Sequence, residues 1–281
     1  MSKKEVSKPE IKSTKIEPPK SVFLEYFESF TVTLIMALFG MTFVIQAVTV
    51  PTGSMQNTIL VGDYLLVNKF VFNAGGNPLP FLPQREIERG DIIVFKYPGN
   101  KLHPESDASR TPPIIPYKIN YVKRVIGLPG ETIEFRDNHV YINGKLLPEH
   151  RVAGDSPDAN SELSSLSALT ISEFEEHDPG ESKYKVYYSQ RSIDAVEAGQ
   201  DVVRSSFEYG VKGKKTLVPP NSFFVMGDSR DNSEDSRVWG YVPYKNIVGQ
   251  ALVIYFSWGT NIRWTRWYKK IRFDRIGTII R

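Results

Sequence analysis

The chain has 281 residues, which is enough for one large domain or two small ones with a sizeable core. It contains no cysteine, and this excludes disulfides, thiolate catalysis, zinc fingers and iron–sulfur clusters. The formal net charge is only +3, so charge gives no reason to expect a nucleic acid as a partner. The indications of function must therefore come from local motifs.

The N-terminal part of the chain consists of two contrasting stretches. Residues 1–29 begin with Lys, Pro, Glu and Ser, a composition typical of a disordered cytoplasmic tail, whereas residues 30–50 are apolar and carry no charge. A helix over 30–50 would be about 31 Å long and would match a bilayer core of about 30 Å. We therefore expect a transmembrane helix there. A buried helix and a cleaved signal peptide are the alternatives, but both are usually shorter.

The lysines around this apolar run are unevenly distributed. Six precede it in residues 1–29, whereas Lys69 is the only one in the next twenty residues. The positive-inside rule then predicts a single-pass protein with a cytoplasmic N-terminus and with residues 51–281 on the other side of the membrane.

The rest of the chain is rich in short β-branched and aromatic stretches separated by Gly, Pro, Asn and Asp turns. These stretches predict strands over 64–72, 91–97, 121–126, 132–136, 140–142, 145–147, 222–226 and 247–256. We expect a mainly β domain of coiled antiparallel sheets, formed by residues 51–150 and 217–260.

Two further segments differ from this β pattern. Residues 151–216 are rich in Ser, Glu, Asp, Gly and Lys, so we expect an insertion, a mobile loop followed by a small accessory lobe. Residues 261–281 interleave aromatic and basic side chains, which suits a membrane interface. A terminal strand with a solvated basic face is the alternative.

Ser54 is a candidate nucleophile, because it follows the apolar run directly within the block 51–55. A serine hydroxyl needs a base, and none of the four histidines lies in an ordered apolar block. Lysine can act as the base only where burial lowers its pKa toward neutrality. Lys123 lies on the largely apolar predicted strand 121–126. On its own, such a lysine is more often one whose charged end reaches solvent.

The alternation of the strand predicts which way these side chains point. Lys123 and Val125 fall on one face, and Val122, Arg124 and Ile126 fall on the other. We therefore expect Lys123 to face inward and Arg124 to point away and stay solvated.

A third block, residues 226–240, carries a long run of acidic and basic residues. The blocks 51–55, 121–127 and 226–240, together with 89–95, resemble in order and spacing those of the bacterial type I signal peptidases, or leader peptidases. The resemblance covers residues 30–150 and 217–260. It implies a serine endopeptidase anchored in the plasma (inner) membrane, with an extracytoplasmic β-rich catalytic domain, that removes N-terminal signal peptides from secreted preproteins.

The resemblance also implies a role for each matching residue. Ser54 would be the nucleophile and Lys123 its base, in a Ser-Lys dyad that forms an acyl-enzyme. The oxyanion hole would be the main-chain N–H of Ser54 and the hydroxyl of Thr52. Ser233 would hydrogen-bond to Lys123 and orient it. The supporting residues would be Asp228, Arg230, Asp235 and Arg237, the last two as an ion pair behind Lys123. Met55, Tyr121 and Val122 would help to shape shallow substrate pockets. These pockets would select small residues at the first and third positions before the cut.

The chain departs from the family pattern at three positions, but none removes a catalytic group. Thr52, Asn57 and Ser229 stand where the family usually has Ser, Pro and Asn. Threonine keeps a hydroxyl donor for the oxyanion and adds a methyl group that restricts its rotamer.

We expect no cofactor and no metal, because no motif for either is present. The expected partners are secretory preproteins and the lipid bilayer, and the sequence gives no oligomeric state. Two other functions stay open. One is a non-catalytic, membrane-tethered β-domain that binds extended peptides and does not need Ser54 or Lys123. The other is a self-cleaving Ser-Lys protein of the repressor type, which would carry a cleavable linker where this chain has its apolar run.

Overall fold

A computed structural model of the chain describes residues 21–72, 84–154, 171–173, 184–200, 203–211, 213–259 and 270–280. The chain divides into two compact units, Met1–Met41 and Thr42–Arg281. Most of the predicted N-terminal tail and parts of the predicted insertion and C-terminal segment lie outside the described residues.

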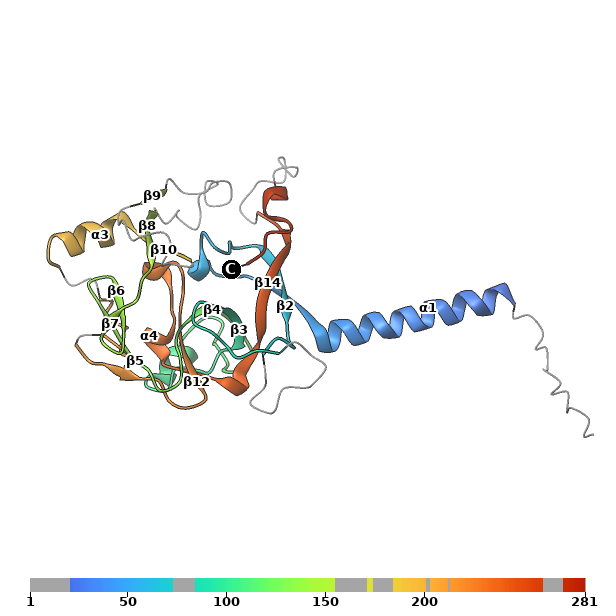
Figure 1. Ribbon diagram of the computed structural model, residues 1–281, viewed down its shortest axis with the longest axis horizontal. Helices are drawn as coiled ribbons and strands as arrows, with labels where there is room; N and C mark the ends of the chain where they lie inside the picture. The colour runs from blue at the N-terminus through green and yellow to red at the C-terminus, as the bar shows by residue number, and fades with distance from the viewer. Residues whose placement is uncertain are drawn as a thin grey trace, which may run out of the picture. The chain divides into compact units, whose positions relative to one another are not determined.

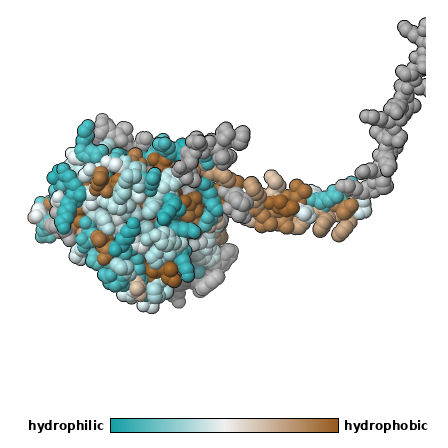
Figure 2. All heavy atoms as spheres, turned by 90° about the horizontal axis from the view of Figure 1, so that it is seen from below, coloured by the Kyte–Doolittle hydropathy of each residue, from teal (hydrophilic) through white to brown (hydrophobic). Residues whose placement is uncertain are grey.

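The first unit contains the helix α1, Val22–Phe39. Ser21 caps its N-terminus, because the Ser21 side chain accepts a hydrogen bond from the Leu24 N–H. Its side chains are mostly apolar, as Figure 2 shows, and no residue of the helix is buried. At 18 residues the helix is long and apolar enough to cross a membrane.

The structure corrects both ends of the predicted helix. The prediction began it at residue 30 and assigned residues 1–29 to the tail, whereas α1 begins at Val22. The prediction extended it to Val50, but α1 ends at Phe39 and is followed by a π-helical turn, Gly40–Val44, and the strand β1, Ile45–Thr49. β1 pairs antiparallel with β2, Asp63–Asn68. Three of its five residues are β-branched, and this favours a strand wherever a partner strand is available.

The second unit is built on an antiparallel sheet, which confirms the mainly β fold. Its described strands, in spatial order, are β1, β2, β14 (Ile247–Ser257), β3 (Ile92–Lys96), β4 (Asn120–Gly127), β12 (Ser222–Met226) and β13 (Val242–Pro243). Figure 1 shows β3, β4 and β12 side by side within this body.

The centre of this sheet is covered on both faces. Along β3, Ile92 and Val94 join one hydrophobic cluster, whereas Ile93 and Phe95 join another. Side chains that alternate along a strand point to opposite faces, so each cluster covers one face. This explains why β3 is a continuous apolar run in the sequence.

A second sheet is the predicted meander. Its described strands are β11 (Thr216–Leu217), β5 (Thr132–Arg136), β6 (His139–Ile142) and β7 (Lys145–Leu146), in that spatial order. Asp137 and Asn138 have φ of 48° and 58°, the positive values that a two-residue hairpin turn between twisted strands requires. The local turn chemistry therefore sets the register of this sheet.

The described part of the 151–216 stretch contains a small sheet and a helix. The strands β8 (His150–Gly154), β9 (Ile171–Glu173) and β10 (Lys185–Tyr188) form the sheet, and β10 runs parallel to β8. The helix α3, Gln190–Glu197, follows β10. Two short helices lie elsewhere, α2 (Pro104–Ala108) and α4 (Ser236–Trp239). All of these elements belong to the same compact unit as the main sheet.

The described C-terminal residues 270–280 fold back on the main sheet. Arg275 pairs with the buried carboxylate of Asp63 at 2.7 Å, and Arg272 lies 3.5 Å from the same carboxylate. The sequence suggested either a membrane interface or a basic face in solvent. Neither describes these two arginines, because both lie close to the buried carboxylate of Asp63. The aromatic and basic residues over 261–269 lie outside the described residues.

Candidate active site

Ser54 lies in a short 3-10 turn, Gly53–Met55, that follows β1 and Val50. Its side chain is buried, with 7% of the residue exposed. Its carbonyl oxygen accepts a hydrogen bond from the Ser229 N–H at 3.2 Å. The turn that carries Ser54 is therefore held against the charged block 226–240, far away in the sequence.

Lys123 lies on β4 and points at Ser54. It is only 3% exposed, and its Nζ is hydrogen-bonded to Ser54 Oγ. The Tyr121 ring centroid lies 5.7 Å from Nζ. The structure thus brings together the two residues that the sequence singled out.

Burial also changes the acidity of this lysine. Desolvation lowers the pKa of Lys123 to about 8, although the negative charges of Asp235 and Glu234 act in the opposite direction. A larger fraction of Lys123 is therefore neutral near pH 8 than for an ordinary lysine, whose pKa is about 10.4. A neutral amine beside a serine hydroxyl can accept its proton.

The prediction that Arg124 stays solvated is wrong. Arg124 is 1% exposed and forms a bidentate ion pair with Asp228, at 2.8 and 2.6 Å. Its guanidinium also lies 4.2 Å from the Tyr184 ring centroid. Alternation did place Arg124 opposite Lys123, but that face is covered by residues from the 151–216 stretch. Long-range packing of this kind has no local signal.

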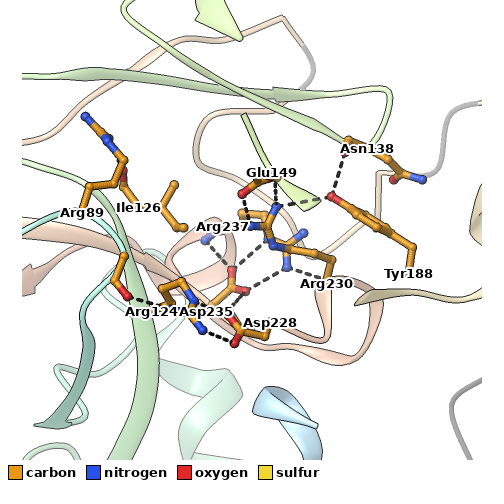
Figure 3. Close-up of polar contacts among 12 residues, drawn as sticks. Arg89, Arg124, Ile126, Asn138, Glu149, Tyr188, Asp228, Arg230, Asp235 and Arg237 are labelled. Atoms are coloured by element: carbon orange, nitrogen blue, oxygen red, sulfur yellow. Dashed lines mark hydrogen bonds and ion pairs between the residues drawn. The ribbon is translucent and has the colours of Figure 1, made fainter. Parts of the chain in front are cut away.

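The block 226–240 is held by two further buried ion pairs (Figure 3). Asp235 pairs with Arg237 at 2.8 Å, and Arg230 pairs with Glu149. Burial alone would raise the pKa of Asp235, but the Arg237 guanidinium outweighs it and the net effect is a lowered pKa. The sequence interpretation missed Glu149, because a single carboxylate at the end of the meander belongs to no motif.

Ser233 lies near Ser54 but does not form the expected hydrogen bond to Lys123. It is fully buried, and its Oγ has no hydrogen-bond partner among the described residues, so the predicted bond to Lys123 is not formed. It does stand close to the nucleophile. A Cβ built on Gly227 would fall 2.3 Å from both Ser233 Oγ and the Ser54 carbonyl oxygen.

This crowding at Gly227 leads to a prediction. Gly227→Ala should reduce peptidase activity by at least about tenfold, because the new methyl group must displace the Ser54 turn or Ser233, and a shift of 1 Å at a reacting group can cost about a hundredfold. Gly40→Ala is the matched control, since its added Cβ meets no atom within 4 Å. The check is kcat/KM on one peptide substrate. Equal activity of the two variants would show that the turn tolerates displacement.

A cleft lies beside Ser54 and Lys123. Its lining includes Thr52, Tyr121 and Val122, three residues predicted to act on substrate. Met55 does not line it. Met55 is 1% exposed, belongs to the core and accepts a hydrogen bond from the Asp228 N–H through its sulfur at 3.4 Å. Its predicted part in a substrate pocket is therefore corrected to a part in the support of the Ser54 turn.

One edge of β4 is open next to this cleft. β3 pairs with β4 over 120–124, whereas β12 on the other side pairs with it only from Arg124 onward. Within the described residues, no strand occupies the second side of 120–123. An unpaired strand edge is a place where an extended peptide can add by main-chain hydrogen bonds.

The sequence interpretation also missed charged residues of the cleft. Arg110, Arg204 and Glu234 line it, and Arg110 donates two hydrogen bonds to Glu234 at 2.7 and 2.8 Å. None of them belongs to a position for which the motifs gave a role. In the described part of the chain, no group of three or more His, Cys, Asp or Glu side chains is placed to hold a metal.

Comparison with known proteins gives the family. Residues 23–258 match the family described as signal peptidase, peptidase S26. The chain belongs to this family. It is therefore a serine peptidase of the hydrolase class, as the resemblance of its motifs predicted.

Individual relatives agree with this assignment. Signal peptidase I of Pseudomonas aeruginosa is 31% identical over 255 residues, which cover 84% of this chain and 74% of the relative. Signal peptidase I of Aquifex aeolicus is 33% identical over 232 residues, which cover 80% of each chain. A solved structure of a signal peptidase I from Enterococcus faecalis is 25% identical, with a TM-score of 0.30, and the match covers 59% of this chain and 97% of that one. The family assignment rests on the sequence matches.

Proposed function

We propose that the protein is a membrane-anchored endopeptidase that removes signal peptides from secretory preproteins with a Ser54–Lys123 dyad. The observation that carries this proposal is the buried hydrogen bond between Lys123 Nζ and Ser54 Oγ, next to an open strand edge. Signal peptidase I is also the name of the relatives that match most of the chain.

The reaction follows from the chemistry of the two residues. Neutral Lys123 accepts the proton of Ser54 Oγ as that oxygen attacks the scissile carbonyl carbon. The Ser54 N–H and the Thr52 hydroxyl stabilise the negative charge that develops on the carbonyl oxygen. The C–N bond then breaks, and Lys123 transfers its proton to the leaving amine. In the second half, Lys123 activates the water that hydrolyses the acyl-enzyme.

The substrate binds as an extended strand along 120–123. Main-chain hydrogen bonds to the open edge of β4 hold it without regard to sequence, and the side-chain pockets supply the preference. Tyr121 and Val122 lie in the cleft and leave room for small side chains, so we expect small residues at the first and third positions before the cut.

The helix α1 anchors the protein in the inner membrane. Its length and apolar surface suit a bilayer, and the lysines before it favour a cytoplasmic N-terminus, which leaves the catalytic unit on the outer side. This topology suits a substrate whose apolar signal segment is still in the bilayer. The catalytic segments still include 51–150 and 217–260, separated by the insertion 151–216. The tail must end before α1 begins at Val22, and β1 (Ile45–Thr49) belongs with the catalytic sheet.

A cleavage assay tests the function. The full chain, purified in detergent, should cut a preprotein whose signal ends in Ala-x-Ala, and Ser54→Ala should lower the rate by about 10³-fold or more, because no other group can form the acyl-enzyme. Ser206→Ala, at an exposed serine, is the control and should keep the wild-type rate. A wild type that binds the signal segment but leaves it uncut would favour the non-catalytic peptide-binding domain.

A further inference from the structure

The loop between β3 and β4 is built around one buried carboxylate. Asp107 is 5% exposed and accepts hydrogen bonds from the Tyr97 hydroxyl at 3.0 Å and from the Asn100 N–H at 2.9 Å. Its carbonyl oxygen accepts another from the Ile114 N–H at 3.0 Å. These bonds fix the loop, so Arg110, three residues after Asp107, projects into the cleft from an ordered support.

The charge of Arg110 is compensated within the cleft. Arg110 Nη2 lies 2.7 and 2.8 Å from the two carboxylate oxygens of Glu234. Both residues are about 40% exposed at their side chains and line the same cleft as Ser54 and Lys123. A solvent-exposed pair of this kind cancels charge at little cost to either partner.

Arg204 also lines this cleft, and no carboxylate of the described residues forms an ion pair with it. Its guanidinium donates to the Asp231 carbonyl oxygen at 3.4 Å and lies 6.0 Å from the Phe207 ring centroid. The segments that carry Arg110 and Arg204 are neighbours, because His103 Nε2 lies 3.9 Å from Glu208 Oε1.

The described lining of the cleft therefore has an excess of positive charge. Besides Lys123, whose pKa is lowered, it holds the two arginines and one carboxylate. A cleft with walls of low dielectric constant concentrates such a field on whatever enters it. A peptide that binds along β4 must pass this charge beside the scissile bond.

We propose that Arg204 is a specificity-determining residue that favours an acidic side chain near the scissile bond of the preprotein. In this proposal, which rests on the proposed function, Arg204 pairs with that carboxylate, and Glu234 moderates the preference by neutralising Arg110. An acidic residue is favoured because it finds a guanidinium that no described carboxylate pairs with, whereas a basic residue finds a carboxylate that is already paired.

The test compares peptides that differ in one charge. Matched preprotein peptides carry Asp or Asn at each of the two positions before and the three positions after the cut, and kcat/KM is measured for the full chain in detergent. At one or more of these positions, the wild type should favour Asp over Asn by about two- to fivefold, the size of an exposed ion pair. The preference should shrink in 0.5 M salt, because salt screens exposed charges.

Three charge variants should change the Asp preference in different ways. Arg204→Gln should remove the Asp preference, Arg110→Gln should weaken it by leaving Glu234 unpaired, and Glu234→Gln should increase it by freeing Arg110. Arg191→Gln is the control, because Arg191 is an exposed cation that does not line this cleft, and it should keep the wild-type ratio. Using the ratio for each enzyme removes any effect on the dyad itself.

The outcomes separate the two proposals. Equal kcat/KM for Asp and Asn peptides in the wild type, or an unchanged ratio in Arg204→Gln, would overturn the role of Arg204 while leaving the peptidase intact. An Arg191→Gln ratio that changes as much as that of Arg204→Gln would also overturn it, because the effect would then be one of total charge. Absence of cleavage of any peptide by the wild type would instead contradict the proposed function.

Discussion

Lys123→Met should lower kcat/KM for preprotein cleavage by about 10²–10⁴-fold, the usual contribution of a general base. Methionine keeps an unbranched apolar side chain in the buried position that Lys123 occupies at 3% exposure, so the sheet should stay intact. The measurement is cleavage of the same Ala-x-Ala preprotein, with thermal unfolding as a check on the fold. Lys118→Met, at an exposed lysine just before β4, is the control and should retain activity.

The pH dependence of activity gives an independent test of Lys123 as the general base. Only the neutral form of Lys123 accepts a proton, so activity should be low at acid pH, rise through about pH 8 and then level off. Glu234→Gln should move this midpoint to lower pH, because the negative charge of Glu234 raises the pKa of Lys123 by stabilising its ammonium form. A midpoint near 6.5 that Glu234→Gln leaves unchanged would indicate a histidine base and contradict the dyad.

The strands were predictable where their signals are local. Residues 132–136 and 222–226 form strands with the predicted bounds, because alternation and flanking turn residues define them within a few positions. β1 was missed because its sequence is as suitable for a membrane helix as for a strand. Residues 45–49 form a strand because they pair with β2, and this pairing partner lies outside the apolar run that predicted the helix.

The residues of the candidate site were also predictable only where a local motif marks them. The motifs indicated Ser54, Lys123 and the charged block, since each lies in a block of recognisable spacing. They did not indicate that Glu149 pairs with Arg230. They also did not indicate that Arg110 lines the cleft. Both depend on how a loop or insertion folds over the sheet, and such packing leaves no periodic pattern in the sequence.

Asp228→Asn should reduce the free energy of unfolding by about 3–5 kcal/mol, the cost of removing one partner from a buried ion pair. Asp228 is 1% exposed, and its carboxylate accepts two hydrogen bonds from Arg124 and one from the Thr58 hydroxyl at 2.6 Å. Asparagine keeps the shape but removes the negative charge with which the buried Arg124 guanidinium pairs. The expected fall in Tm is about 10 °C, measured by thermal unfolding in detergent.

The matched control is Asp194→Asn, at an exposed carboxylate on α3 that accepts a hydrogen bond from Gln190. Its free energy of unfolding should stay within about 0.5 kcal/mol of the wild type. Because Arg124 follows Lys123 directly on β4, the Asp228→Asn variant should also lose activity at temperatures where it is still folded. Wild-type stability in Asp228→Asn would mean that water or another acceptor compensates Arg124. The buried pair would then contribute neither to the stability of the sheet nor to the position of Lys123.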